Sequence, residues 1–282
     1  MDHDPATESA AGPQRGYVIC SEPRSGSTLL CEWLGSTGVF GRPREYFRTV
    51  GDSVAIEKNP GGLADVLEQA ATPNGVYGMK LFSYHVDTTS KARWLGRLPG
   101  ARFIHLERRD LLGQAISLVR AWQTQQYYSH QNAHGSLRYD RRAIQRHLMQ
   151  LALANARWRT YFARNGLDVL WLVYEDIVRD PDATMRAIAA HVGIDEPAAI
   201  RPELIRVAVQ RDAVSDEWRT RFLAETSDLD RLDHPLGRTR IGVRRLARDA
   251  GYWARRWTGR GNPVSPKGTV GGIPRTDHSN TG

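Results

Sequence analysis

The chain has 282 residues, of which 40% are hydrophobic, so it is long enough to bury a full core as a single α/β catalytic domain. The net charge of +8 comes from residues 236–282, where ten lysines and arginines outnumber two aspartates. Residues 1–235 have no net charge, which excludes a basic nucleic-acid groove across the catalytic domain. No apolar run has the length of a membrane helix, residues 1–15 lack signal-peptide features, and two cysteines make no disulfide framework, so we expect a cytoplasmic protein.

The first predicted unit is a buried strand that runs through a turn of small residues into a helix, in the stretch YVICSEPRSGSTLL. Glycine lets the backbone approach a ligand, hydroxyl groups add donors around the N–H groups of the helix N-terminus, and arginine adds a fixed positive charge. These features predict an anion site, and the alternative is an ordinary capped turn. The candidate anion-binding residues are Arg24, Ser25, Gly26, Ser27 and Thr28.

The loop lacks the lysine of the nucleotide-triphosphatase motif GxxxxGK[ST], and its PRSGST string instead resembles the 5′-phosphosulfate loop of sulfotransferases. It is most similar to the bacterial family typified by trehalose 2-sulfotransferase. The resemblance implies 3′-phosphoadenosine-5′-phosphosulfate (PAPS) as cofactor, no metal, and a P-loop-like α/β fold with a central parallel sheet and helices on both faces. The chain departs from the trehalose enzymes at Pro23, at Arg42 and in a shorter connection over residues 49–74, which argues against trehalose itself as the acceptor.

Glycines and a proline after the first helix break regular structure and leave Glu45 beside the aromatic residues Tyr46 and Phe47. A carboxylate among aromatic side chains is a candidate base. From the residues alone, Glu45 is either such a base or a surface glutamate paired with Arg44 or Arg42. The resemblance implies a general base that deprotonates the acceptor hydroxyl.

Gly75–Phe82 is the second predicted strand, with Lys80 near its end and His85 just beyond it. Ligands of open α/β sheets bind outside the carboxyl ends of the strands, which favours both residues as site residues. Lys80 would stabilise charge on the bridging oxygen as the sulfuryl group leaves, and His85 is the second candidate for the base. The alternative for His85 is a loop histidine that only makes a hydrogen bond.

Ala101–Glu107 is the third predicted strand, and a basic turn then opens a helix with Asp110 in its first turn. Ser117 follows two helical turns later. The family uses an arginine and a serine at this separation to hold the 3′-phosphate of PAPS. The resemblance therefore implies Ser117 together with Arg108 as first choice and Arg109 as second, and the alternative is a solvated helix start with surface arginines.

The second half of the chain predicts a scaffold helix over residues 139–164, a fourth strand over residues 167–174, and a helix opened by Pro181 and closed by Gly193. The string YEDIVRDP resembles a family signature that serves packing and capping.

The segment around Arg211 resembles the family segment that closes over the 3′ end of the cofactor. Arg211 is either a phosphate ligand or the partner of Asp212 or Asp216 in a salt bridge.

We expect a disordered N-terminus over residues 1–15, the sulfotransferase domain over residues 16–235 and a basic tail over residues 236–282. In the tail, an apolar stripe at helical spacing with arginines around it predicts an amphipathic helix over residues 240–258. Such a helix suits contact with an anionic membrane, and the alternatives are packing on the catalytic domain or on the second subunit of a homodimer.

The predicted function is sulfuryl transfer from PAPS to a hydroxyl of a carbohydrate, a glycolipid or another small-molecule acceptor, free or lipid-linked. Two alternatives stay open. One is a kinase on the same fold, which would need Mg²⁺ and ATP, and the other is a non-catalytic nucleotide-binding adaptor whose basic tail does the work.

Overall fold

The computed structural model describes residues 12–47, 49–50, 53–54, 61–89, 93–126, 135–195, 198–207, 212–229, 231 and 233. The chain divides into two units, Met1–Leu229 and Asp230–Gly282. The predictions for residues 1–11, for Arg211 and for the tail helix over residues 240–258 lie outside the described residues.

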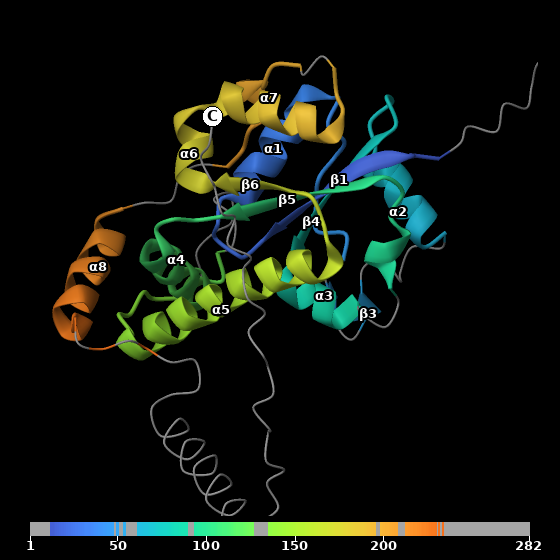
Figure 1. Cartoon of the computed structure of the whole chain (residues 1–282). Helices are drawn as coiled ribbons and strands as arrows, with labels where there is room; N and C mark the ends of the chain where they lie inside the picture. Colours follow the sequence, from blue (N-terminus) through green and yellow to red (C-terminus); the bar gives the residue numbers. More distant parts are fainter. Residues whose placement is uncertain are drawn as a thin grey trace, which may run out of the picture. The chain divides into compact units, whose positions relative to one another are not determined.

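The centre of the described unit is a parallel sheet with the strand order β4-β1-β5-β6 (Figure 1). Its members are β1 (Arg15–Ser21), β4 (Val76–Phe82), β5 (Ala101–Glu107) and β6 (Val169–Val173). These are the four strands that the sequence predicts, so the predicted parallel sheet is confirmed. A short antiparallel pair, β2 (Thr49–Val50) and β3 (Ser53–Val54), lies outside this sheet.

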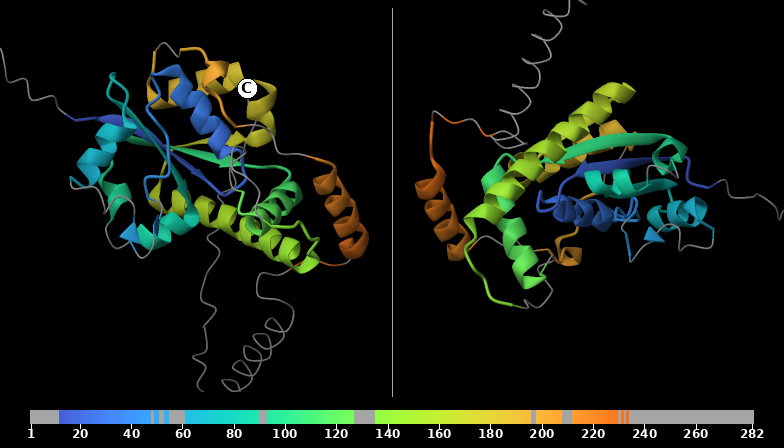
Figure 2. Two further views of the ribbon diagram at one scale, coloured as in Figure 1. Left: turned by 180° about the vertical axis from the view of Figure 1, so that it is seen from behind. Right: turned by 90° about the horizontal axis from the view of Figure 1, so that it is seen from below.

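Helices cover both faces of the sheet because successive side chains of β1 point to opposite faces and nearly all are buried. Tyr17 and Ile19 pack in one cluster with side chains of α1 (Ser27–Thr37) and α7 (Pro181–Val192). Val18 and Cys20 pack in a second cluster with α2 (Leu63–Ala70) and α5 (Arg141–Asn165). Figure 2 shows the two helix layers on either side of the strands.

A third apolar cluster joins α5 to α4 (Leu111–Thr124) and α8 (Ala213–Thr226), through side chains such as Ile116, Leu151 and Trp218. Asp110, expected in the first turn of α4, is its N-cap and accepts the Gly113 N–H at 2.9 Å. These helices make the walls around the carboxyl ends of β1, β4 and β5.

The remaining described helices are short and connect the larger elements. They are α3 (Ser83–Thr89), η3 (Trp94–Arg97), α6 (Tyr174–Arg179) and η4 (Pro202–Leu204). In the described part of the chain, none of the helices is both long enough and apolar enough to cross a membrane.

Candidate active site

The loop between β1 and α1 adopts a conformation that its glycine makes feasible. Arg24 and Gly26 both have positive φ angles, 65° and 90°. A Cβ on Gly26 would lie 2.1 Å from Cδ2 of Tyr174, so a larger residue is excluded both by strain and by this ring. No side chain caps the N-terminus of α1, which leaves its first N–H groups directed at the space in front of the loop.

A cavity of about 900 Å³ opens in front of this loop, at the carboxyl ends of the strands. It has the position that open α/β sheets use for ligands. The residues predicted from the sequence that line it are Arg24, Gly26, Ser27, Thr28, Glu45, Lys80, Arg108 and Ser117.

Lys80 connects the predicted base to the loop. Its Nζ lies 2.8 Å from Oε1 of Glu45 and donates a hydrogen bond to Oγ1 of Thr28 at 3.2 Å. The lysine and glutamate side chains are only 5% and 15% exposed, so this ion pair is shielded from bulk water. Glu45 stands there because Arg44 pairs with Met79 as an isolated parallel bridge and its carbonyl accepts the Lys80 N–H at 2.9 Å.

A cluster of cations lies on another part of the loop. Nε of Arg24 donates to Oγ of Ser117 at 2.9 Å, and Arg108 donates to the carbonyl oxygen of Arg24 at 3.3 Å. The Arg108 guanidinium also lies over the ring of Tyr174, 5.1 Å from its centroid. Burial, and next the neighbouring charges of Arg108 and Arg120, lower the pKa of Arg24, so an anion bound here would relieve a repulsion.

Three of the predicted residues do not line the cavity. Arg109 turns to the surface, where it pairs with Asp176 at 2.7 Å and stays 60% exposed. His85 is fully buried, and its Nδ1 accepts the Phe82 N–H at 3.2 Å. Ser25 is buried beneath the loop, and its Oγ has no hydrogen-bond partner among the described residues.

Glu22 is a cavity residue that the sequence analysis did not single out. It is 4% exposed, and its Oε1 accepts the Ser83 N–H at 3.2 Å and the Trp158 Nε1–H at 3.0 Å. Burial raises the pKa of this carboxyl, and hydrogen bonds from Ser83 and Trp158 and the charge of Arg157 oppose the rise. Its position directly after a buried strand is the sequence signal that could have identified Glu22. Through these hydrogen bonds Glu22 connects the loop to Ser83, the residue after β4, and to Trp158 of α5.

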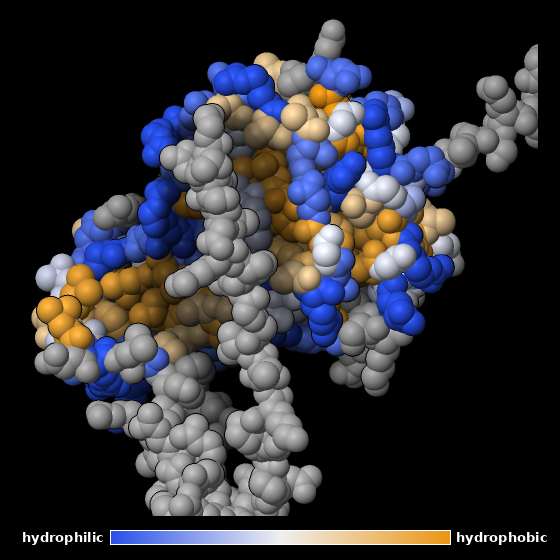
Figure 3. All heavy atoms as spheres, viewed as in Figure 1, coloured by the Kyte–Doolittle hydropathy of each residue, from blue (hydrophilic) through white to orange (hydrophobic). Residues whose placement is uncertain are grey.

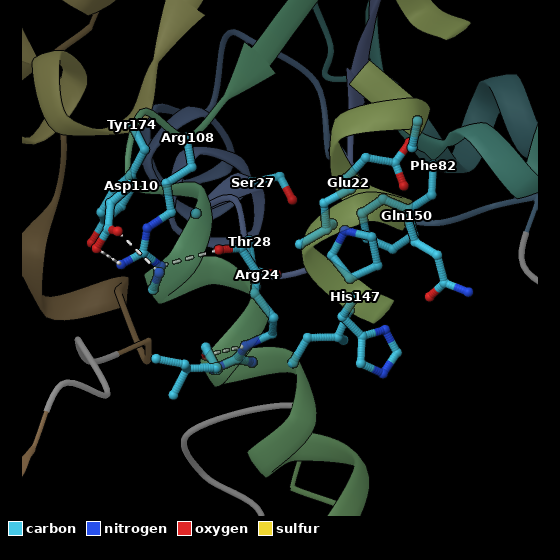
Figure 4. A pocket seen from close by; sticks show the side chains of 18 of the residues that line it. Glu22, Arg24, Ser27, Thr28, Phe82, Arg108, Asp110, His147, Gln150 and Tyr174 are labelled. Atoms are coloured by element: carbon cyan, nitrogen blue, oxygen red, sulfur yellow. Dashed lines mark hydrogen bonds and ion pairs between the residues drawn. The ribbon is translucent and has the colours of Figure 1, made fainter. Parts of the chain in front are cut away.

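The far wall of the cavity contains residues that the sequence analysis did not single out. They include Trp122 of α4 and His147, Gln150 and Arg157 of α5, the helix that periodicity assigns to scaffold. In Figure 4, His147 and Gln150 lie on the opposite side of Arg24 and Thr28 from Arg108 and Tyr174. On the face shown in Figure 3, apolar surface gathers in a hollow over α4, α5 and α8. No sequence signal marks these residues, because an amphipathic helix gives no sign of what its polar face meets.

The site thus combines a shielded carboxylate–lysine pair, a loop at the N-terminus of α1 and a cationic cluster around one cavity. Among the residues that the structure describes, no group of three or more histidines, cysteines, aspartates or glutamates is placed to hold a metal ion. A parallel α/β sheet with these groups at its strand ends suits a transferase that moves an anionic group to an acceptor.

The sequence profile described as Stf0 sulphotransferase matches residues 16–225, and the chain belongs to this family. It is therefore a sulfotransferase, and the family, fold class and enzyme class predicted from the sequence are confirmed.

Two mycobacterial relatives are similar over most of their length. The chain is 30% identical over 263 residues to the trehalose 2-sulfotransferase of Mycobacterium tuberculosis (strain ATCC 35801 / TMC 107 / Erdman), with 76% of this chain and 97% of the relative covered. It is 27% identical over 252 residues to the trehalose 2-sulfotransferase of Mycolicibacterium smegmatis, with 73% and 93% covered. Among solved structures, a sulfotransferase from Alicyclobacillus acidocaldarius aligns with a TM-score of 0.43 and 16% identity, over 77% of this chain and 93% of that chain.

Proposed function

We propose that the cavity binds PAPS and that the chain transfers its sulfuryl group to a hydroxyl of a carbohydrate. The observation that carries the proposal is Lys80, whose ammonium group bridges the carboxylate of Glu45 and the hydroxyl of Thr28. A base for the hydroxyl and a cation for the leaving oxygen thus stand beside a loop suited to an anion. Both mycobacterial relatives are trehalose 2-sulfotransferases, which supports a carbohydrate acceptor.

The groups around the cavity fit a ligand with two anionic ends. The uncapped N-terminus of α1, with Ser27 and Thr28, suits the 5′-phosphosulfate. Arg24, Arg108 and Ser117 suit the 3′-phosphate. Nε of Arg108 is buried and makes no hydrogen bond among the described residues, and its nearest charged partner, Oε1 of Glu175, lies 3.9 Å away. Arg109 is left out because its guanidinium pairs with Asp176 outside the cavity.

PAPS, when bound, supplies the sulfuryl group. Glu45 would accept the proton of the acceptor hydroxyl as the hydroxyl oxygen bonds to sulfur. Lys80 would donate a hydrogen bond to the oxygen between sulfur and the 5′-phosphate and would stabilise the charge on that oxygen when adenosine 3′,5′-bisphosphate leaves. Thr28 keeps the ammonium group directed at the loop. We leave His85 out of this scheme because it is buried outside the cavity.

Transfer of labelled sulfate tests this proposal. The purified chain is incubated with [³⁵S]PAPS and with trehalose or glucose in excess EDTA, and the sugars are separated and counted. We expect a labelled sugar in the presence of EDTA. A kinase would instead consume ATP and need Mg²⁺, and an adaptor would bind adenosine 3′,5′-bisphosphate without turnover, so either of those results refutes the proposal.

The tail supports a separate proposal for a cytoplasmic enzyme: residues 240–258 bind anionic membrane reversibly. The sequence places Trp253 and Trp257 on one face of a predicted helix, and each arginine near such a surface adds about 1 kcal/mol. Co-sedimentation with phosphatidylserine vesicles at two salt concentrations should fall when both tryptophans are replaced by serine. Unchanged sedimentation of the variant refutes membrane binding by the tail. If light scattering shows a homodimer for the unmodified chain and a monomer for the variant, the tryptophan face belongs to an interface with a second subunit.

A further inference from the structure

The cavity extends to both sides of the loop. Figure 4 shows Arg108, Asp110 and Tyr174 on one side of Ser27 and Thr28, and Glu22, Phe82, His147 and Gln150 on the other. The proposed grip on the 3′-phosphate uses the first side. Nζ of Lys80 lies 5.2 Å from the centroid of the Phe82 ring, so the lysine–glutamate pair borders the second side. An acceptor hydroxyl that reaches Glu45 therefore has its remaining atoms on the second side.

One face of α5 lines this second side. His147, Gln150, Ala154 and Arg157 follow one another at separations of three, four and three residues, which places them on a single helix face, and all four line the cavity. Trp122 of α4 stands opposite His147 with its ring centroid 6.0 Å away, and 58% of it is exposed. We call the four α5 residues and Trp122 of α4 together the α5 wall.

The α5 wall combines two kinds of contact surface. The exposed indole of Trp122 offers a flat apolar face with a single N–H donor. Gln150 carries a donor and an acceptor, and Arg157 carries only donors and is paired with Asp87. Burial lowers the pKa of His147, and a hydrogen bond with the Gln150 side chain opposes this shift.

A sugar ring matches this combination, because its C–H groups form an apolar face and its hydroxyls both donate and accept at the rim. An anionic acceptor would not use the acceptor atoms of Gln150 and His147. A purely apolar acceptor would leave unpaired the polar atoms that the hydrogen bond between these two side chains does not use. Ala154 lies between Gln150 and Arg157 on this face, and its small side chain adds little bulk there.

We propose that the α5 wall binds the acceptor and selects a polyhydroxylated sugar ring, with Trp122 under the ring and Gln150 and His147 at its hydroxyls. This inference rests on the proposed function and deepens it. The wall acts on acceptor binding, while Glu45 and Lys80 act on the transfer step.

Kinetics of single variants test the wall. We expect Gln150→Ala and His147→Ala each to raise KM for trehalose about 3- to 10-fold, the range of one or two lost hydrogen bonds, with kcat changed less than 2-fold. The dissociation constant of adenosine 3′,5′-bisphosphate, measured by calorimetry, should stay within 2-fold. Arg142→Ala is the matched control, because Arg142 is exposed on α5 and does not line the cavity.

A second acceptor without a sugar ring separates the outcomes. KM for 4-nitrophenol should not rise in Gln150→Ala. Trehalose kinetics that are unchanged in both wall variants overturn this inference and leave the proposed function standing. A loss of bisphosphate affinity in the wall variants assigns the wall to the donor nucleotide and also overturns it. Absence of transfer by the unmodified chain to any acceptor overturns the proposed function itself.

Discussion

Replacing Glu45 by glutamine is the sharpest test of the proposed chemistry, because it keeps the shape of the side chain. The amide oxygen can still accept a hydrogen bond from Lys80, now 2.8 Å from the carboxylate, so Lys80 should keep its contact with Thr28. The variant loses only the negative charge and the oxygen that takes up the proton.

General-base catalysis contributes at least about 100-fold, so we expect turnover to fall by about 100-fold or more, equivalent to about 2.7 kcal/mol in the barrier. Initial rates at saturating PAPS and acceptor measure it. The dissociation constant of adenosine 3′,5′-bisphosphate should change little. Glu68→Gln is the control, because Glu68 is exposed on α2 and outside the cavity.

The variant also leaves Lys80 without its counter-charge in a shielded place. Breaking a fully buried pair costs about 3–5 kcal/mol, and the cost here should be smaller because the pair borders a cavity. We therefore expect a fall in melting temperature of a few degrees, at about 2–4 °C per kcal/mol. Turnover within 3-fold of the unmodified chain, with the protein folded, would refute the assignment of Glu45 as base.

Three further predictions concern the cofactor grip, the loop and the core. Arg108→Ala should weaken binding of adenosine 3′,5′-bisphosphate by about 10-fold or more in calorimetry. Arg109→Ala breaks only an exposed ion pair and should leave the dissociation constant within 2-fold. Equal effects of the two variants would contradict the assignment of Arg108 to the 3′-phosphate. Gly26→Ala should abolish bisphosphate binding, because the new Cβ collides with the Tyr174 ring at a positive φ, and retained affinity would show that the loop can rearrange. Burial lowers the pKa of His105 from 6.5 to about 4, so between these pH values the unfolded chain binds more protons than the folded chain. The free energy of unfolding therefore falls as the pH drops from 6.5 to 4, by about 3 kcal/mol at pH 4. Urea unfolding should show a smaller loss between pH 7 and pH 4 in His105→Gln, and parallel curves would contradict the assignment.

The sequence alone was sufficient for the architecture, because each strand and its neighbouring helix are specified locally. Four apolar runs of strand length separated by helical patterns predict the strands, and the resemblance implies that they form a parallel sheet. The structure has these strands within a few residues. The turn between the first strand and the first helix was equally readable, since a glycine among hydroxyl residues marks a tight strand-to-helix turn, and anion binding by this loop stays a prediction. The predicted tail helix over residues 240–258 stays a prediction.

Side-chain placement was decided only by the tertiary structure. Arg108 and Arg109 are neighbours in the sequence, so spacing could not tell them apart, and it is Asp176, distant in the chain, that draws Arg109 out of the cavity. Glu45 and Lys80 meet because Arg44 pairs with Met79 beside β4, a contact that no local pattern records.

The α5 wall shows for a whole helix which features the sequence predicts and which only the tertiary structure decides. Periodicity correctly predicts a helix near residues 139–164, and it distinguishes the apolar face from the polar face. Periodicity cannot say whether a polar face meets water or a cavity, because that depends on which elements pack around it. Here α4 and the strand ends enclose part of that face, and Gln150 and His147 become cavity residues by tertiary contact rather than by any property of their own segment.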